Sequence, residues 1–241
     1  MKLTQEQQQS FVNIINTATS AGIEAIVFQN KDIGVASGIR DGSCAIVVRN
    51  DVPPISMKMG LTRLPQLKKR LDLMNGAKME MTLKESDRGE ITLMDFVNGK
   101  TKTQYRCSAS ANIKAPATIA DPGVLGLVTV NKEELTMALN GVRAMGATQV
   151  VIKVSDATGV VSIDMTDSND KFSVELEQAI QFEEPDSAAF YYESGIFSSL
   201  LKAALGANDS LSFAVGTSGT IQFELNNCEL SIFAQVDGDN Q

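Results

Sequence analysis

The order of hydrophobic patterns in this sequence occurs twice, and this repetition restricts the possible folds more than any other feature. Residues 5–21 carry apolar side chains at the spacing of one buried helix face, namely Phe11, Ile14, Ile15 and Ala18. Residues 131–146 repeat that face 124 positions later, with Leu135, Ala138, Leu139 and Val142. Asn131 and Glu134 are also spaced as a capping box, which is typical of the start of a helix.

The elements that follow these two helices recur as well. A second helix is expected over residues 62–75, with Leu64, Leu67 and Leu71 on one face, and Phe197, Leu200 and Ala204 stand 133 positions later. Short apolar runs predict strands at 23–29, 33–39, 44–49, 55–59, 78–84, 90–97 and 103–107. The strand residues Met79, Met81 and Leu83 correspond to Leu211, Phe213 and Val215, 132 positions later. Any α+β chain has helices and strands in loosely similar order, but the near-constant offset favours a duplicated α+β domain.

The two copies are separated by a segment of different composition. Residues 108–126 are rich in Ala, Ser, Pro and Gly and have no periodicity, which is typical of an extended connector. We therefore expect an N-terminal domain over residues 1–107, a connector over 108–126 and a C-terminal domain over 127–241.

The residue types present disfavour an enzyme. The chain has no histidine, which excludes catalysis built on imidazole, and neither of the glycine-rich nucleotide-binding motifs. The three cysteines are an odd number without a CxxC motif, so they indicate neither a disulfide framework nor a zinc site. Asp164, Asp167 and Asp170 have the charge for a metal site, but the calcium-loop glycine is missing and a polar hairpin turn is the better interpretation. We expect no cofactor and no bound metal.

The start of the sequence indicates no secretory signal. The N-terminal residues lack the basic-then-apolar order of a secretory signal, and no apolar run is long enough to span a membrane. The expected location is intracellular, in the cytoplasm or nucleoid of a host cell, with a phage origin left open.

The duplicated order of elements resembles that of the sliding clamp family of DNA polymerase processivity factors, in particular the two-domain clamps of the proliferating cell nuclear antigen and phage types. Three local stretches carry the resemblance together with the element order: GVASGIRDGSCAIVV from residue 34, NKEELTMALNGVRAMG from residue 131 and LSIFAQVDGDN from residue 230. The resemblance implies an α+β fold in which helices line a ring and sheets form its outside. It covers essentially the whole chain.

What the resemblance implies about function is a homotrimeric ring of six domains. Such a ring encircles double-stranded DNA without reading its sequence, is loaded by a separate ATP-dependent clamp loader and tethers a DNA polymerase. Ring closure would use edge strands, expected at residues 103–110 and 172–180. The interface residues implied in this way are Tyr105, Cys107, Val174 and Leu176. The alternative is an oligomeric scaffold or structural protein with duplicated domains that does not bind DNA.

The distribution of charge is compatible with a DNA-facing role of the helices. The net charge of the chain is -8, yet the four expected helices sum to +3 and the remainder to -11. The helix over 5–21 departs from this trend, because Glu6 is its one charged residue. A solvated helix face is the alternative interpretation of the basic cluster. The expected DNA-facing residues are Lys2, Arg63, Lys68, Lys69, Arg70, Lys132, Arg143 and Lys202.

The resemblance also implies a pocket that binds short peptide tails of partner proteins beside the connector. The alternative is that these apolar residues only attach the connector to the sheet, and both roles can hold together. The expected pocket residues are Ile39, Cys44, Ala45, Ile46, Ile113, Pro116, Ile119, Val124, Leu125, Phe233 and Ala234.

Overall fold

The computed structural model describes the chain apart from residues 31–33, 41–43, 49–51, 54, 56–57, 75–78, 88, 117–122, 156–159, 167–169, 177, 180–187, 208, 226–227 and 235–241. The chain divides into two compact units. The first unit comprises Met1–Asp41, Ala45–Ile119 and Asn226–Glu229, and the second comprises Gly42–Cys44, Ala120–Leu225 and Leu230–Gln241. The long stretches of the two units meet between Ile119 and Ala120, outside the described residues, so the expected domain limits stay predictions.

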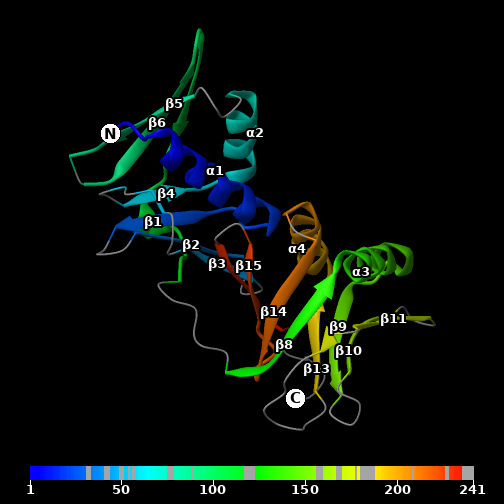
Figure 1. Cartoon of the computed structure of the whole chain (residues 1–241). Coiled ribbons are helices and arrows are strands. Elements are labelled where there is room, and N and C mark those ends of the chain that lie inside the picture. The colour runs from blue at the N-terminus through cyan, green and yellow to red at the C-terminus, as the bar shows by residue number, and fades with distance from the viewer. Residues whose placement is uncertain are drawn as a thin grey trace. The chain divides into compact units, whose positions relative to one another are not determined.

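In its described residues, the first unit contains two α-helices that contact each other and strands of two sheets (Figure 1). One run of paired strands, which is part of a larger sheet, has the order β3-β2-β1-β4, and a second sheet has the order β5-β6-β7. The residues Met1 to Leu3 lie along β5, because the Leu3 N–H donates to the Met81 carbonyl at 3.1 Å and the Leu83 N–H donates to the Met1 carbonyl at 2.7 Å. The elements are α1 (Gln5–Ser20), β1 (Ile26–Asn30), β2 (Gly34–Arg40), β3 (Cys44–Val48), β4 (Met59–Leu61), α2 (Leu64–Met74), β5 (Glu80–Glu85), β6 (Ile91–Asn98), β7 (Thr101–Arg106) and the 3-10 helix η2 (Ser110–Asn112).

The second unit also contains a pair of contacting helices, α3 and α4 (Figure 1). One sheet has the strand order β11-β10-β9-β13, and a run of paired strands that is part of a larger sheet has the order β12-β8-β14-β15-β16. The elements are β8 (Val124–Asn131), α3 (Lys132–Met145), β9 (Gln149–Ser155), β10 (Val160–Thr166), β11 (Lys171–Leu176), β12 (Gln178–Ala179), β13 (Ala188–Glu193), α4 (Ser194–Ala207), β14 (Ser210–Gly216), β15 (Ile221–Leu225) and β16 (Cys228–Ile232).

The two units share one topology, which confirms the duplicated α+β fold predicted from the sequence. The sheet β3-β2-β1-β4 corresponds strand by strand to β11-β10-β9-β13, and β5-β6-β7 corresponds to β14-β15-β16. In the second unit β8 pairs with β14 as the residues Met1 to Leu3 pair with β5 in the first. The first strand of each copy therefore lies against the strand that follows the second helix of that copy.

The helices have the buried faces expected from their sequences. Every apolar residue assigned to the inner face of α1, α2 and α3 is buried. The capping box of α3 is present, because the Glu134 N–H donates to Asn131 Oδ1 at 2.9 Å and the Asn131 N–H donates to Glu134 Oε2 at 2.7 Å. A second capping box, between Thr4 and Gln7, starts α1. Gly141 lets α3 approach its sheet closely, since a Cβ at this position would lie 2.5 Å from the Phe172 ring.

Two strands begin three or four residues later than the sequence predicts, for local reasons. The strand expected from residue 23 begins at Ile26, because the Ile23 N–H donates to the Ala18 carbonyl at 2.9 Å and so belongs to the end of α1. Of the strand expected at 55–59, residues 56–57 lie outside the described residues, and the strand described here is β4, Met59–Leu61. The Ile55 N–H donates to the Pro53 carbonyl at 2.7 Å, so it is not available for pairing with another strand.

Two further predictions about the strands are corrected. The edge strand expected at 172–180 is divided into β11, which pairs with β10, and β12, which pairs with β8 in the other sheet. The segment expected to be an extended connector contains η2, and β8 begins at Val124, before its expected end. Ser108 holds the start of this segment against β4, since its N–H donates to the Gly60 carbonyl at 2.9 Å.

Candidate functional site

The exposed side of α1 carries amide side chains in place of charges. Gln9 Nε2 donates to Asn13 Oδ1 at 3.0 Å on this side of the helix. Glu6, in the first turn, is the one charged residue of α1. If α1 faces DNA, its contribution is neutral hydrogen bonding and not phosphate neutralisation.

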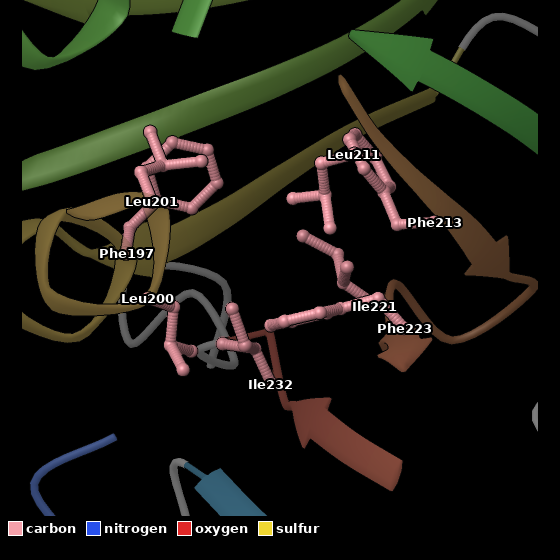
Figure 2. A pocket seen from close by; sticks show the side chains of 8 residues that line it. All are labelled: Phe197, Leu200, Leu201, Leu211, Phe213, Ile221, Phe223 and Ile232. Carbon is pink, nitrogen blue, oxygen red and sulfur yellow. The ribbon is translucent and has the colours of Figure 1, made fainter. Parts of the chain in front are cut away.

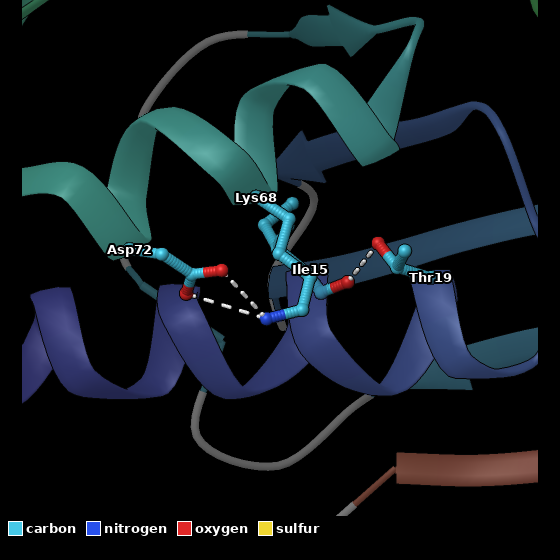
Figure 3. A network of polar contacts seen from close by, with 4 residues as sticks. All are labelled: Ile15, Thr19, Lys68 and Asp72. Atoms are coloured by element: carbon cyan, nitrogen blue, oxygen red, sulfur yellow. Dashed lines mark hydrogen bonds and ion pairs between the residues drawn. The ribbon is translucent and has the colours of Figure 1, made fainter.

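The basic cluster of α2 divides into residues with different surroundings. Lys68 Nζ forms an ion pair with Asp72 one turn later, with 3.0 Å between nitrogen and oxygen (Figure 3). Lys69 is exposed. The Arg70 side chain extends to β7, where it donates to the Gln104 carbonyl at 2.6 Å. Of these three cations, Lys69 is therefore the one that protrudes from the helix into solvent.

Tyr105 lies beneath two arginines. The carbons of the Arg63 and Arg70 guanidinium groups lie 5.8 and 5.6 Å from the centre of its ring, within the range of cation–π attraction. The hydroxyl donates to the Thr62 carbonyl. Burial of the ring raises the pKa of the Tyr105 hydroxyl, while the positive charge of Arg63 acts in the opposite direction. Arg63 precedes α2 with a left-handed backbone (φ 56°), which is rare for a residue other than glycine.

The other expected DNA-facing residues differ in how they are paired. Lys2 Nζ forms an ion pair with Glu80 Oε1 at 3.0 Å, and Lys132 Nζ forms one with Asp209 Oδ1 at 3.7 Å. Arg143 on α3 and Lys202 on α4 are exposed, and neither takes part in an ion pair among the residues that the structure describes. Since surface ion pairs contribute little energy, Lys2 and Lys132 can exchange these carboxylates for other anions.

β7 is the last strand of its sheet within the described part of the chain. The Cys107 N–H donates to the Thr92 carbonyl on the β6 side, whereas the Ser108 N–H donates to Gly60 on the opposite side. Because backbone groups of successive residues alternate in direction, those of Lys102, Gln104 and Arg106 point away from β6. The interface residues expected from the sequence do not include these three. The alternation of Lys102, Gln104 and Arg106 with Thr103 and Tyr105 is nevertheless the pattern of a strand with one polar side.

The side chains expected at the trimer interface lie mostly inside their own units. Tyr105, Val174 and Leu176 are at most 5% exposed. Cys107 is half-buried, and burial raises the pKa of its thiol to about 12. Any contact that these positions make with a second chain would therefore use backbone groups and neighbouring side chains.

Asp164 connects three strands of the second unit. Its carboxylate on β10 is buried and lies 2.9 Å from Lys153 Nζ on β9 and 3.2 Å from Lys171 Nζ on β11. The Ser173 hydroxyl, also on β11, donates to Asp164 Oδ1 at 2.5 Å. These partners account for Asp164 without a metal, and no cluster of potential metal ligands occurs among the described residues, which do not include Asp167.

An apolar cavity lies between α4 and the strands β14, β15 and β16 (Figure 2). Its volume is about 10 Å³, which is near the minimum that one water molecule requires. All lining side chains are apolar: Phe197, Leu200, Leu201, Leu211, Phe213, Ile221, Phe223 and Ile232. The cavity is a small packing gap in the core, too small for an organic ligand.

The expected peptide-pocket residues range from buried to exposed. Cys44, Ala45 and Ile46 are buried on β3, whereas Ile39, Leu125, Phe233, Ala234 and Pro116 are half-buried. Val124 is 47% exposed on β8, and Ile119 lies outside the described residues. Ile113 is half-buried, and a Cβ at Gly60 would lie 2.9 Å from Ile113 Cδ1. Ile113 thus does attach the segment after η2 to β4.

The whole chain is similar in structure to solved clamps. It superposes with a TM-score of 0.69 and 12% identity on a chain of the structure of the C-terminal region of FEN-1 bound to A. fulgidus PCNA, covering 99% of this chain and 98% of that one. For the proliferating cellular nuclear antigen from Entamoeba histolytica, the TM-score is 0.68, the identity is 15% and 98% of each chain is covered. The chain has the sliding-clamp fold. No family model and no curated protein sequence matches it, so the likeness concerns the fold.

The clamp fold explains the duplicated topology, since it accommodates both copies over nearly the whole length. In the part of the chain that the structure describes, no helix combines the length and apolar character needed to cross a membrane.

Proposed function

We propose that the chain is a DNA sliding clamp that encircles duplex DNA as a homotrimeric ring and tethers a DNA polymerase. The observation that carries this proposal is the likeness to PCNA structures over 98–99% of the chain. The clamp acts inside a cell without catalysing a reaction, and a separate ATP-dependent loader places it on DNA. The phage origin stays a prediction.

Two dissimilar sheet edges support self-assembly. β7 ends one sheet of the first unit and β11 ends one sheet of the second. A contact between different edges of identical chains is head-to-tail, and such contacts form a closed ring when the rotation permits it. We propose that three chains close the ring in this way.

Charge on the helices supports weak, sequence-independent contact with DNA. Lys69, Arg143 and Lys202 are exposed cations without an ion-pair partner among the described residues. Three chains would present nine such cations to the DNA. The neutral side of α1 adds no charge, so retention would rest on the closed ring more than on affinity.

Partner recruitment is proposed at apolar residues that are not fully buried. The FEN-1 region bound to A. fulgidus PCNA shows that one protein of this fold takes up a partner's C-terminal region. In this chain Val124, Leu125 and Phe233 have the exposure that such a peptide needs, and apolar anchors usually dominate peptide contacts.

Sedimentation equilibrium over a dilution series tests the assembly. The proposal predicts a mass of three times 25.8 kDa that falls toward one chain on dilution. A protein that stays monomeric at every concentration would contradict the ring. The neutral side of α1 favours the second candidate function, a scaffold that does not bind DNA. A stable trimer that does not bind DNA would identify the protein as such a scaffold.

A further inference from the structure

The outward edge of β7 is short and bounded. The Cys107 N–H is bonded to Thr92 on the β6 side, and the Ser108 N–H is bonded to Gly60 on the opposite side. Because backbone groups alternate in direction along a strand, the residues whose N–H and C=O groups point away from β6 are Lys102, Gln104 and Arg106. The ladder ends at Ser108, whose N–H is already bonded to Gly60 of β4. Gln104 is therefore the central position at which another strand could pair with β7.

Arg70 occupies this central position. Its guanidinium donates to the Gln104 carbonyl at 2.6 Å, and its central carbon lies 5.6 Å from the centre of the Tyr105 ring. The ring is 1% exposed and is held by the bond from its hydroxyl to Thr62, so it forms a fixed surface beneath the arginine. The orientation of Arg70 thus has two supports, a hydrogen bond and a cation–π contact.

We propose that Arg70 is a gate on the assembly edge: it caps the Gln104 carbonyl in the single chain and must leave before a second copy can pair along β7. This inference rests on the proposed function, and the occupant it commits to is strand β11 of a second copy. The unpaired backbone groups of an exposed edge strand can bond to strands of unrelated chains, and a charged side chain over the central carbonyl limits such pairing. Arg70 thereby disfavours assembly until the correct strand arrives.

Charge supports β11 as the occupant. The outward residues Lys102 and Arg106 of β7 are exposed and basic. On β11 Glu175 is exposed, whereas the positive charge of Lys171 is already paired with Asp164 of the same unit. Opposite charges on facing strands stabilise their pairing, and they set its register.

Replacing Arg70 should strengthen association. In Arg70→Ala the Gln104 carbonyl is free to accept a bond from the incoming strand, and the dissociation constant of each interface should fall about fivefold, the effect of one ordinary hydrogen bond. Lys69→Ala is the matched control, because it removes the same charge from the adjacent, exposed position. Arg70→Lys keeps the charge but loses the planar group, so its effect should lie between those of wild type and Arg70→Ala.

The experiment has two arms. Sedimentation equilibrium compares wild type with the three variants, and fluorescence anisotropy titrates each with a labelled synthetic peptide of residues 171–180, KFSVELEQAI. The proposal predicts tighter self-association and tighter peptide binding for Arg70→Ala, with Lys69→Ala unchanged. Equal or weaker binding by a folded Arg70→Ala, checked by circular dichroism, would overturn it. If all proteins are monomeric the ring fails, and the peptide arm alone then decides whether Arg70 gates the edge.

Discussion

Asp164 should stabilise the outer strand of the second unit, and Asp164→Asn measures by how much. The carboxylate is 2% exposed and joins β10 to β9 through Lys153 and to β11 through Lys171 and Ser173. Asparagine keeps the shape and can still accept from Ser173, but it loses the charge. We expect the strand pair β10–β11 to be weakened more than any other part of the chain.

The size of the effect follows from the contacts. A hydrogen bond to a charged group contributes about 1.5–3 kcal/mol and one between neutral groups about 0.5–1.5 kcal/mol, so the Ser173 bond loses about 1 kcal/mol. The two lysines are about half-exposed, and each such ion pair contributes about 0.2–1 kcal/mol. The total loss is about 2 kcal/mol.

Hydrogen exchange followed by mass spectrometry measures this loss locally. A reduction of about 2 kcal/mol corresponds to a roughly thirtyfold fall in protection of the amides at 171–176, provided that exchange occurs through equilibrium opening. Glu224→Gln, at an exposed position of β15 away from both proposed assembly edges, makes the same change of charge and should leave this protection within a factor of about two. Unchanged protection in Asp164→Asn would refute the reasoning.

Two further predictions concern titrating groups. The hydrogen bond from Lys84, the hydrogen bond from Gln104 and the charge of Lys84 lower the pKa of Asp95 below 3.8, so the ionised carboxylate stabilises the fold above pH 3.8 and this stabilisation is lost as the pH falls through the lowered pKa. Acid unfolding of Asp95→Asn should lack this loss of stability. An acid-unfolding profile identical to that of wild type would contradict the prediction. Because burial raises the pKa of Cys107 to about 12, the thiols of the native protein should react slowly with a disulfide reagent at pH 8, whereas all three thiols of the denatured protein should react. Rapid reaction of one thiol in the native protein would show that Cys107 is accessible.

The helices could be predicted from the sequence because their signals are local. The apolar stripes of α1, α2 and α3 and the Asn131–Glu134 capping box depend on residues within one or two turns. The repeat offset then revealed the duplication without any tertiary information. The predicted strand limits were less accurate. They depend on backbone hydrogen bonds, from Ile55 to Pro53 and from Ile23 to Ala18, that the spacing of apolar residues does not indicate.

The candidate surfaces were harder to predict because side-chain direction depends on packing. Arg70 was expected to face DNA with Lys68 and Lys69, but α2 lies close enough to β7 for Arg70 to bond Gln104. Tyr105 was expected at an interface, but its ring is buried beneath the two arginines. Sequence placed these residues on the correct elements, whereas their contacts follow from how the elements pack.

Topological retention on DNA tests the central claim most directly. Chains dissociated by dilution are concentrated in the presence of a closed circular plasmid, and the mixture is passed over a size-exclusion column at a salt concentration that removes electrostatically bound protein. The account predicts that the protein elutes with the circle and is released when a restriction enzyme cuts the plasmid once. Equal retention on circular and linear DNA, or none on either, would contradict a ring that encircles the duplex.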